Sequence, residues 1–272
     1  MKTGAVFLVF SIISTVSVAG DFLGDQVDAL MVLIEDHGPD AVIEHIEKFE
    51  PVQRLQLYEL ARELYIFSEW EGRNLDDYIT VMDSGIEEAL YQANSSSDSF
   101  TIAVFLDMAN VMSYNLSADL AECWPGDTLT RHRRHFERGL SAALQCIEWR
   151  HELDKGPYSF FMAYWAAGIH QLSLGRHREA IYSFVKSLNS AQQLTIDAGR
   201  PLGVSPQAGF ELLLAHGYLG LAMQICGEDE GSQFENAIQA FQEGVEYPEW
   251  GGDDYSFGIA QLMWARDRII RE

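Results

Sequence analysis

The sequence is poor in positive charge. It contains 18 Lys and Arg residues against 41 Asp and Glu residues, which gives a formal net charge of −23 over 272 residues. Proteins that bind nucleic acid need clustered Lys and Arg side chains to neutralise phosphates, so we do not expect nucleic acid as a partner. An acidic surface favours solubility and attracts basic partners or cations, but it does not define a function.

Cysteine is also scarce. The three cysteines, Cys123, Cys146 and Cys226, are an odd number, so at least one thiol stays unpaired within the chain. The helices expected below separate Cys123 from Cys146 by on the order of 25 Å, which is too far for a disulfide. Either of these two could pair with Cys226. A chain of this length builds its core without disulfides, and we therefore expect buried, inert thiols.

Catalytic and metal-binding motifs are missing from the sequence. It contains no Gly-x-Ser-x-Gly motif, no phosphate-binding loop and no zinc-protease His-Glu motif. His132 and His135 have the spacing of two metal ligands, but the flanking arginines would repel a cation. Glu148 and His151 form a single Glu-x-x-His, whereas a di-iron site in a helical bundle needs two. We therefore expect no metal, no cofactor and no enzymatic activity, and an enzyme with a dispersed site is the alternative left open.

The first residues have the composition of an export signal. Lys2 is the only charged residue before Asp21, and the segment Ala5–Val18 is almost wholly apolar. Small residues at Ser17 and Ala19 match a signal-peptidase site, so we predict a signal peptide over residues 1–19, cleaved after Ala19 or the next residue. An uncleaved anchor is the alternative, although the segment is shorter than the roughly 20 residues of a spanning helix. No other segment is long and apolar enough to span a membrane, and we expect a periplasmic or secreted protein.

The rest of the chain has the pattern of an all-α protein. Apolar residues recur at intervals of three and four positions, the breaks contain Gly and Pro, and no strand alternation is sustained. We expect N-terminal helical hairpins over residues 20–99 and, continuous with them, a helical repeat region over residues 100–272. The predicted helices are Asp25–Glu35, Pro39–Phe49, Val52–Trp70, Leu75–Ala93, Phe100–Glu122, Thr128–Leu153, Tyr158–Leu174, Arg176–Ala198, Pro206–Cys226, Gln233–Tyr247 and Tyr255–Arg271.

The segment Tyr164–Ala191 places small residues where two helices would have to touch, with bulky aromatic residues beside them. The small residues are Ala167, Gly168, Gly175 and Ala180, and the aromatic ones are Tyr164, Tyr182 and Phe184. This spacing resembles the tetratricopeptide repeat, in which an antiparallel helix pair needs a small residue at each close crossing. A second, similar unit places Gly220 in its first helix and Ala237, Phe241 and Gly244 in its second. The resemblance implies an α-solenoid of stacked hairpins, a scaffold that usually binds other molecules.

In this family the first helix of each hairpin lines a concave face on which ligands usually dock. The resemblance assigns to that face Met162, Trp165, Ile169 and Leu172 from the first unit, and Leu214, Gly217, Leu221 and Gln224 from the second. These residues are mostly apolar, so the family's clamp for a C-terminal carboxylate, which uses Lys, Arg and Asn, is not expected. In one interpretation a neighbouring helix, Thr128–Leu153 or Phe100–Glu122, covers the face, since apolar helical stripes are usually core. In the other the face is an open channel or peptide groove.

One basic island interrupts the acidic sequence. Its residues are Arg131, His132, Arg133, Arg134, His135 and Arg138. We expect it in the opening turns of a helix, where cationic side chains oppose the helix dipole. Its arginines either pair with Glu137 and neighbouring carboxylates or dock an acidic group of a partner.

These features together predict an exported, non-enzymatic interaction module. It would bind a peptide or a partner protein through its concave face and through Arg131, Arg134 and Arg138. The alternative is a periplasmic carrier or transporter-accessory protein that binds a small apolar ligand.

Overall fold

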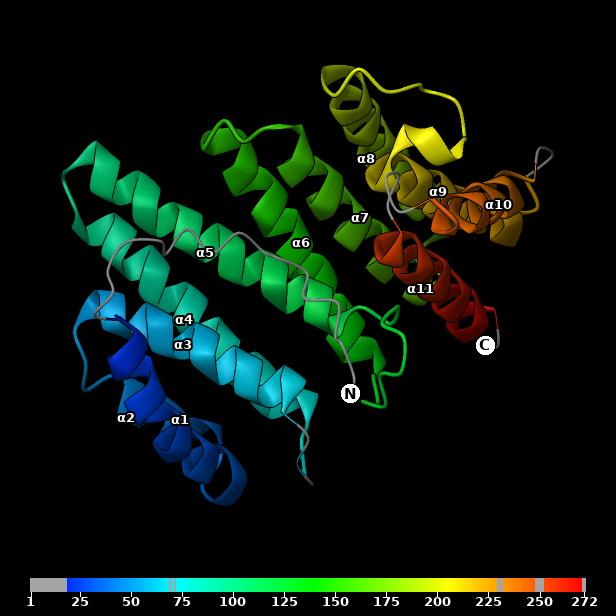
Figure 1. The fold of residues 1–272 in the computed structure, drawn as a ribbon. Coiled ribbons are helices and arrows are strands. Elements are labelled where there is room, and N and C mark those ends of the chain that lie inside the picture. Colours follow the sequence, from blue (N-terminus) through cyan, green and yellow to red (C-terminus); the bar gives the residue numbers. More distant parts are fainter. Residues whose placement is uncertain (1–18, 69, 71, 229–231, 248–251, 271–272) are drawn as a thin grey trace. The chain divides into compact units, whose positions relative to one another are not determined.

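The computed structural model describes residues 19–68, 70, 72–228, 232–247 and 252–270, and these residues form helices and their connections (Figure 1). No strand occurs among them. The predicted all-α fold is confirmed, because eleven α-helices pack sequentially in adjacent pairs in the described part of the chain. They are α1 (Ala19–Asp36), α2 (Pro39–Ile46), α3 (Pro51–Phe67), α4 (Leu75–Ser95), α5 (Ser99–Leu120), α6 (Arg133–Glu152), α7 (Pro157–Ser173), α8 (His177–Asp197), α9 (Phe210–Cys226), α10 (Gln233–Val245) and α11 (Asp253–Ile269), with a short 3-10 helix η1 (Pro206–Ala208) before α9.

The sequence marks most helix starts. Proline occupies the first turn of α2, α3 and α7, where its missing N–H costs nothing. Asn74 caps α4, because its side chain accepts a hydrogen bond from the backbone N–H of Asp77 at 2.8 Å. Three predicted starts are wrong. The first helix already includes Ala19, whereas its predicted start was Asp25. The sixth helix begins at Arg133 rather than Thr128, and the ninth begins at Phe210, since Gly209 breaks the chain after η1 with a φ of 97°.

The chain divides into two compact units, and the division falls within α5, between Leu116 and Ser117. The boundary predicted from the sequence, between residues 99 and 100 of two continuous helical regions, stays a prediction. In the N-terminal unit α1 packs on α2 and α3, and α4 packs on both α2 and α3. Gly85 of α4 lies against Tyr58 of α3 and Met112 of α5, where a Cβ atom would collide with both side chains.

In the C-terminal unit each helix from α6 to α11 packs on the next, and α9 also contacts α7 and α11 (Figure 1). The most extensive contact joins α7 to α8. The buried residues of these two helices include Phe161, Trp165 and Ile169 on α7 and Phe184 on α8. Ser187 of α8 donates a hydrogen bond to the carbonyl of Phe161 at 2.8 Å, which fixes the register of the pair.

Small residues lie at the helix crossings where the sequence pattern placed them. A Cβ atom on Gly168 would lie 2.5 Å from the ring of Phe184, so α7 and α8 approach closely at this point. Gly175 forms the turn between them with a φ of 71°, a left-handed conformation that glycine adopts without strain. Ala180 is fully buried on α8. In the second pair, Gly220 of α9 lies directly against the backbone of Gln233 and Phe234 at the start of α10.

The predicted export signal lies outside the described residues, apart from Ala19 at the start of α1. Among the described residues, no helix combines the length and the apolar character that crossing a membrane requires.

Replacing Gly220 with Ala tests the crossing of α9 and α10. The new Cβ atom would meet the backbone of α10, with the Cα atom of Phe234 only 2.9 Å away, and backbone cannot move aside as a flexible side chain does. We expect Gly220→Ala to lower the free energy of unfolding in urea by about 3 kcal/mol. Gly24→Ala is the matched control, because Gly24 is also helical but has no atom within 4 Å of its Cβ position. It should be neutral or slightly stabilising, and equal effects of the two substitutions would contradict the crossing.

Candidate functional site

The last carbonyl groups of α5 accept hydrogen bonds from side chains. The last four carbonyls of any α-helix have no partner within the helix. In α5 these belong to Ser117, Ala118, Asp119 and Leu120. His170 of α7 donates from Nε2 to Ser117 at 2.8 Å, and Trp124 donates from its indole to Ala118 at 2.7 Å. Arg131 donates to the other two.

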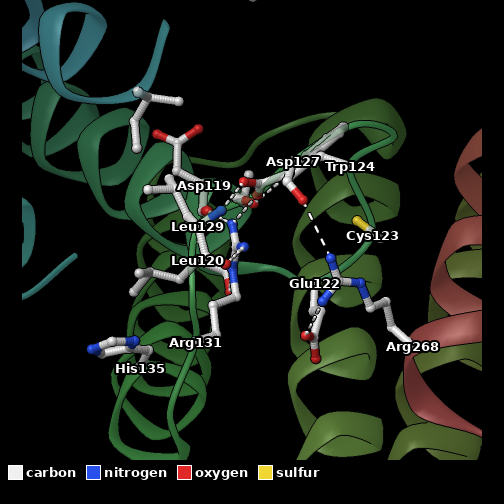
Figure 2. A network of polar contacts seen from close by, with 12 residues as sticks. Asp119, Leu120, Glu122, Cys123, Trp124, Asp127, Leu129, Arg131, His135 and Arg268 are labelled. Atoms are coloured by element: carbon white, nitrogen blue, oxygen red, sulfur yellow. Dashed lines mark hydrogen bonds and ion pairs between the residues drawn. The ribbon is translucent and has the colours of Figure 1, made fainter. Parts of the chain in front are cut away.

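Arg131 holds the connection between α5 and α6, residues 121–132, against the end of α5 (Figure 2). Its guanidinium donates to the carbonyls of Asp119 at 2.8 Å and Leu120 at 2.9 Å, and it forms an ion pair with Asp127 at 2.6 Å. The side chain of Arg131 is only 3% exposed. A cation at a helix C-terminus also complements the helix dipole, so this side chain acts as a structural cap.

The same connection carries an indole ring to the C-terminal unit's aromatic residues. The ring of Trp124 lies 5.8 Å from that of Trp165 on α7 and 6.4 Å from that of Phe257 on α11. Trp165 in turn lies 6.0 Å from Tyr218 of α9, which stacks on Phe184 of α8 at 5.5 Å. Edge-to-face and offset contacts of this kind are the favoured arrangements of aromatic pairs.

A buried polar cluster lies beside these rings. It consists of Cys123, Trp165, Tyr218 and Gln261, each at most 2% exposed. The amide of Gln261 donates to the sulfur of Cys123 at 3.7 Å, and the hydroxyl of Tyr218 lies near the other three side chains. Burial raises the pKa of Cys123 to about 12 and also raises that of Tyr218. Both groups are therefore neutral near pH 7, and the cluster joins α7, α9 and α11 without offering a nucleophile.

Helix α11 covers the side of α9 that the family resemblance assigned to ligand binding. Gly217 of α9 lies against Leu262 of α11, whose Cγ atom would be 3.2 Å from a Cβ atom on Gly217. Near its end, α11 reaches the α5–α6 connection, as Figure 2 shows. There Arg268 donates to the carbonyl of Asp127 at 3.3 Å and lies 3.7 Å from the carboxylate of Glu122.

The residues predicted for the concave face fall into two groups. Trp165, Ile169, Leu172, Leu214, Gly217 and Leu221 are buried, and we call this set the α7–α9 face. Met162 and Gln224 are partly exposed, and Gln224 donates to the carboxylate of Glu235 at 2.8 Å. The face is thus covered within the described chain, and Trp124 and α11 take part in covering it. Of the two helices predicted for this role, Thr128–Leu153 corresponds to α6, which does pack on α7. The parts of Trp124 and α11 were not predicted, since no local pattern links Trp124 or Gln261 to α7 and α9.

The basic island does not form one surface. Arg131 lies before α6 rather than in its opening turns, and its guanidinium is buried as described above. Arg133 is exposed and pairs with Glu137 at 2.9 Å. Arg134 is exposed, whereas Arg138 is half-buried. Of the three arginines predicted to bind a partner, only Arg134 is exposed.

The candidate histidines cap a helix. The backbone N–H of His132 donates to Nδ1 of His135 at 3.2 Å, and the side chain of His132 accepts from the backbone of His135 in return. This reciprocal capping box uses both imidazoles as hydrogen-bond acceptors at the start of α6. Within the described residues, no group of three or more His, Cys, Asp or Glu side chains could hold a metal ion. The three cysteines are free; Cys123 and Cys146 are buried as expected, whereas Cys226 is partly exposed.

Comparisons with known proteins do not place the chain in a family. No family model matches the sequence, and no curated protein matches it. One solved structure, from work described as "Computational Design of Self-Assembling Cyclic Protein Homooligomers", aligns over 93% of this chain and 94% of its own chain. The two are 13% identical, and the TM-score is 0.26, which carries no conclusion about function or assembly.

Arg131→Met tests the cap on α5. The substitution leaves the carboxylate of Asp127 without its partner and two helix carbonyls without donors in a buried place. We expect the free energy of unfolding to fall by about 3 kcal/mol or more. Arg133→Met is the control, because Arg133 is 70% exposed and its ion pair lies at the surface. It should change stability by less than about 0.5 kcal/mol. A cost of Arg131→Met as small as that of the control would refute the cap.

His170 makes stability depend on pH. Burial lowers the pKa of His170 to about 4, below the ordinary value of 6.5. Between these values the unfolded chain binds a proton that the folded chain does not, so stability falls as the pH drops from 6.5 towards 4. We expect this residue alone to contribute a loss of about 3 kcal/mol at the acid end. His170→Gln keeps a donor for Ser117 but cannot titrate, so its unfolding free energy should depend less steeply on pH in this window. Parallel pH profiles for the variant and the parent would rule the effect out.

Proposed function

We propose that this protein is a non-enzymatic interaction module whose α7–α9 face binds an amphipathic helix of a partner protein. The proposal takes α7–α8 and α9–α10 as two tetratricopeptide-like hairpins. It is supported by the close approach of Gly168 to Phe184, the left-handed turn at Gly175 and the close approach of Gly220 to α10. The apolar segment Ala5–Val18 supports export as part of the same proposal.

The observation that carries the proposal is the packing of α11 against α9. Leu262 of α11 lies against Gly217 of α9, where the missing side chain lets the two helices approach. A glycine of α11, Gly258, lies against Phe241 of α10 and against Phe210 at the start of α9, so α11 also packs closely beside the face. The α7–α9 face thus has the shape and apolar character to take one side of a helix, which is a common mode of peptide recognition.

The charges around the face favour a basic partner helix. Glu122 holds Arg268 at one end of α11, and Glu235 lies beside Gln224 on α9. The whole chain carries a formal charge of −23, so the long-range field attracts cationic segments and repels acidic ones. The partner helix should therefore combine a leucine-like side chain that fits against Gly217 with an arginine about 1.7 turns further along, which is the spacing of Leu262 and Arg268 in α11.

Selection from a display library of amphipathic helical peptides on the immobilised full-length protein tests this function. Selected peptides should be basic and should carry the leucine-to-arginine spacing of α11. Hydrogen exchange should then show altered protection in α7 and α9 on binding. Binders whose footprint lies only on α8 or α6, or a selection that enriches no helix, would count against the proposal.

A matched pair of variants locates the binding face. Gln224 is partly exposed at the edge of the face. Gln224→Lys adds a positive charge where a basic peptide docks, so it should raise the dissociation constant of such a peptide by about 5-fold or more. Arg178, exposed on α8, is the control. Arg178→Gln should leave the dissociation constant unchanged within about 2-fold.

A further inference from the structure

We propose that α11 is a built-in competitor for the α7–α9 face, so that a partner helix binds only when α11 leaves its seat. This inference rests on the proposed function and adds its regulation. It follows from what α11 covers, how little apolar surface holds it there and how it is joined to the rest of the chain.

The buried side of α11 has few large apolar residues. Its buried positions are Tyr255, Gly258, Gln261, Leu262 and Ala265. Only Tyr255 and Leu262 are large and mainly apolar, because the others are small or carry an amide. The neighbouring α9 buries ten residues, five of them leucines. Since burial of apolar side chains supplies most of the packing free energy, α11 is held less firmly than α9.

Most polar contacts of α11 also favour release, although a buried hydrogen bond from the hydroxyl of Tyr255 to the carbonyl of Pro206, 2.7 Å long, anchors its first turn. Arg268 is 41% exposed, and its contacts to Glu122 and to the Asp127 carbonyl are longer than 3.2 Å. An ion pair that water reaches contributes little to stability. Inside the cluster, the hydrogen bond from Gln261 ends on sulfur, which is a weak acceptor. The contacts of Arg268 and Gln261 place α11 in register but add little to its retention.

The connectivity makes α11 a competitor. It is the last helix of the described chain, and it is joined to α10 only through the connection between Val245 and Asp253. When α11 leaves, it stays tethered at a high effective concentration and returns unless another helix takes its place. The apparent affinity for a partner is then the intrinsic affinity reduced by the fraction of molecules in which α11 is undocked. The face that α11 leaves includes Gly217, and Tyr218 beside it loses its contact with Gln261.

Competition by a labelled peptide tests the inference on the full-length protein. The probe is a synthetic, end-capped peptide with the sequence of α11, residues 253–269, and its binding is followed by fluorescence anisotropy. Leu262→Ala removes the side chain that lies against Gly217 and so weakens the packing of α11 on the face. The dissociation constant of the probe should therefore fall by about 10-fold or more, because the intramolecular competitor binds less well. Met263→Ala is the matched control, since Met263 is the next residue and is half-buried. It should change the dissociation constant by less than about 2-fold.

An engineered disulfide that holds α11 against α9 provides the opposite test. A Cβ atom on Gly217 would lie 3.2 Å from Cγ of Leu262, so the two positions are close enough to test an engineered disulfide, which needs a Cβ separation of about 3.5–4.5 Å. In the double variant Gly217→Cys with Leu262→Cys, the two redox states are compared with each other, because the substitution at Gly217 itself alters the face. Oxidation should hold α11 in place and lower probe binding by about 10-fold or more relative to the reduced form of the same variant. Mass spectrometry of the cross-linked peptide distinguishes this bond from one to Cys123, Cys146 or Cys226.

The outcomes separate this inference from the function on which it rests. Tighter binding by Leu262→Ala together with loss on oxidation supports it. If the probe binds parent, Leu262→Ala and oxidised protein equally well, α11 is not the competitor, although the protein still binds helices. If no variant binds the probe or any selected peptide, while circular dichroism shows an intact helical fold, the proposed function itself fails.

Discussion

The C-terminal unit depends on how the last four carbonyls of α5 find their donors. A helix that ends inside a protein must satisfy these groups, and here the donors are His170, Trp124 and Arg131. Because Arg131 and Trp124 both belong to the α5–α6 connection, satisfying α5 also fixes the path of that connection. The path places Trp124 against Trp165 and sets Glu122 and the Asp127 carbonyl where Arg268 of α11 reaches them. One requirement of backbone hydrogen bonding thus positions a helix more than 130 residues further along the chain.

The sequence predicts what depends on local pattern. The apolar period and the Gly and Pro breaks located all eleven helices, and the small residues at Gly168, Gly175 and Ala180 lie at a close crossing, a turn and a buried helix position. It failed where a residue acts over a distance. Arg131 reads as part of a basic helix start, yet its hydrogen bonds to α5 require an extended connection, so α6 begins only at Arg133. Composition alone therefore could not distinguish the buried Arg131, which caps α5, from the exposed arginines of the basic island.

The covering of the α7–α9 face shows the same limit. Its apolar residues were predicted correctly as a stripe, but which segment lies on them depends on contacts such as that between Gly217 and Leu262. A glycine on one helix and a leucine on another carry no local signal of their pairing. Leu262 of α11 fits against Gly217 of the face, and Gly258 of α11 lies against Phe241 of α10 and Phe210 of α9. This complementarity, more than any single residue, makes the face a candidate for recognising a helix.

The glycines at helix crossings differ in which atoms a Cβ atom would meet. This difference determines which substitutions each position can accept during evolution. At Gly139 and Gly168 the obstacle is a side chain, that of His170 and of Phe184, so a smaller residue there could make room for a methyl group. At Gly220 the obstacle is the main chain of α10, which every residue type shares. Among descendants of this protein, the first two positions should therefore covary with their partners. The third should remain glycine in every lineage that keeps α9 and α10 in contact.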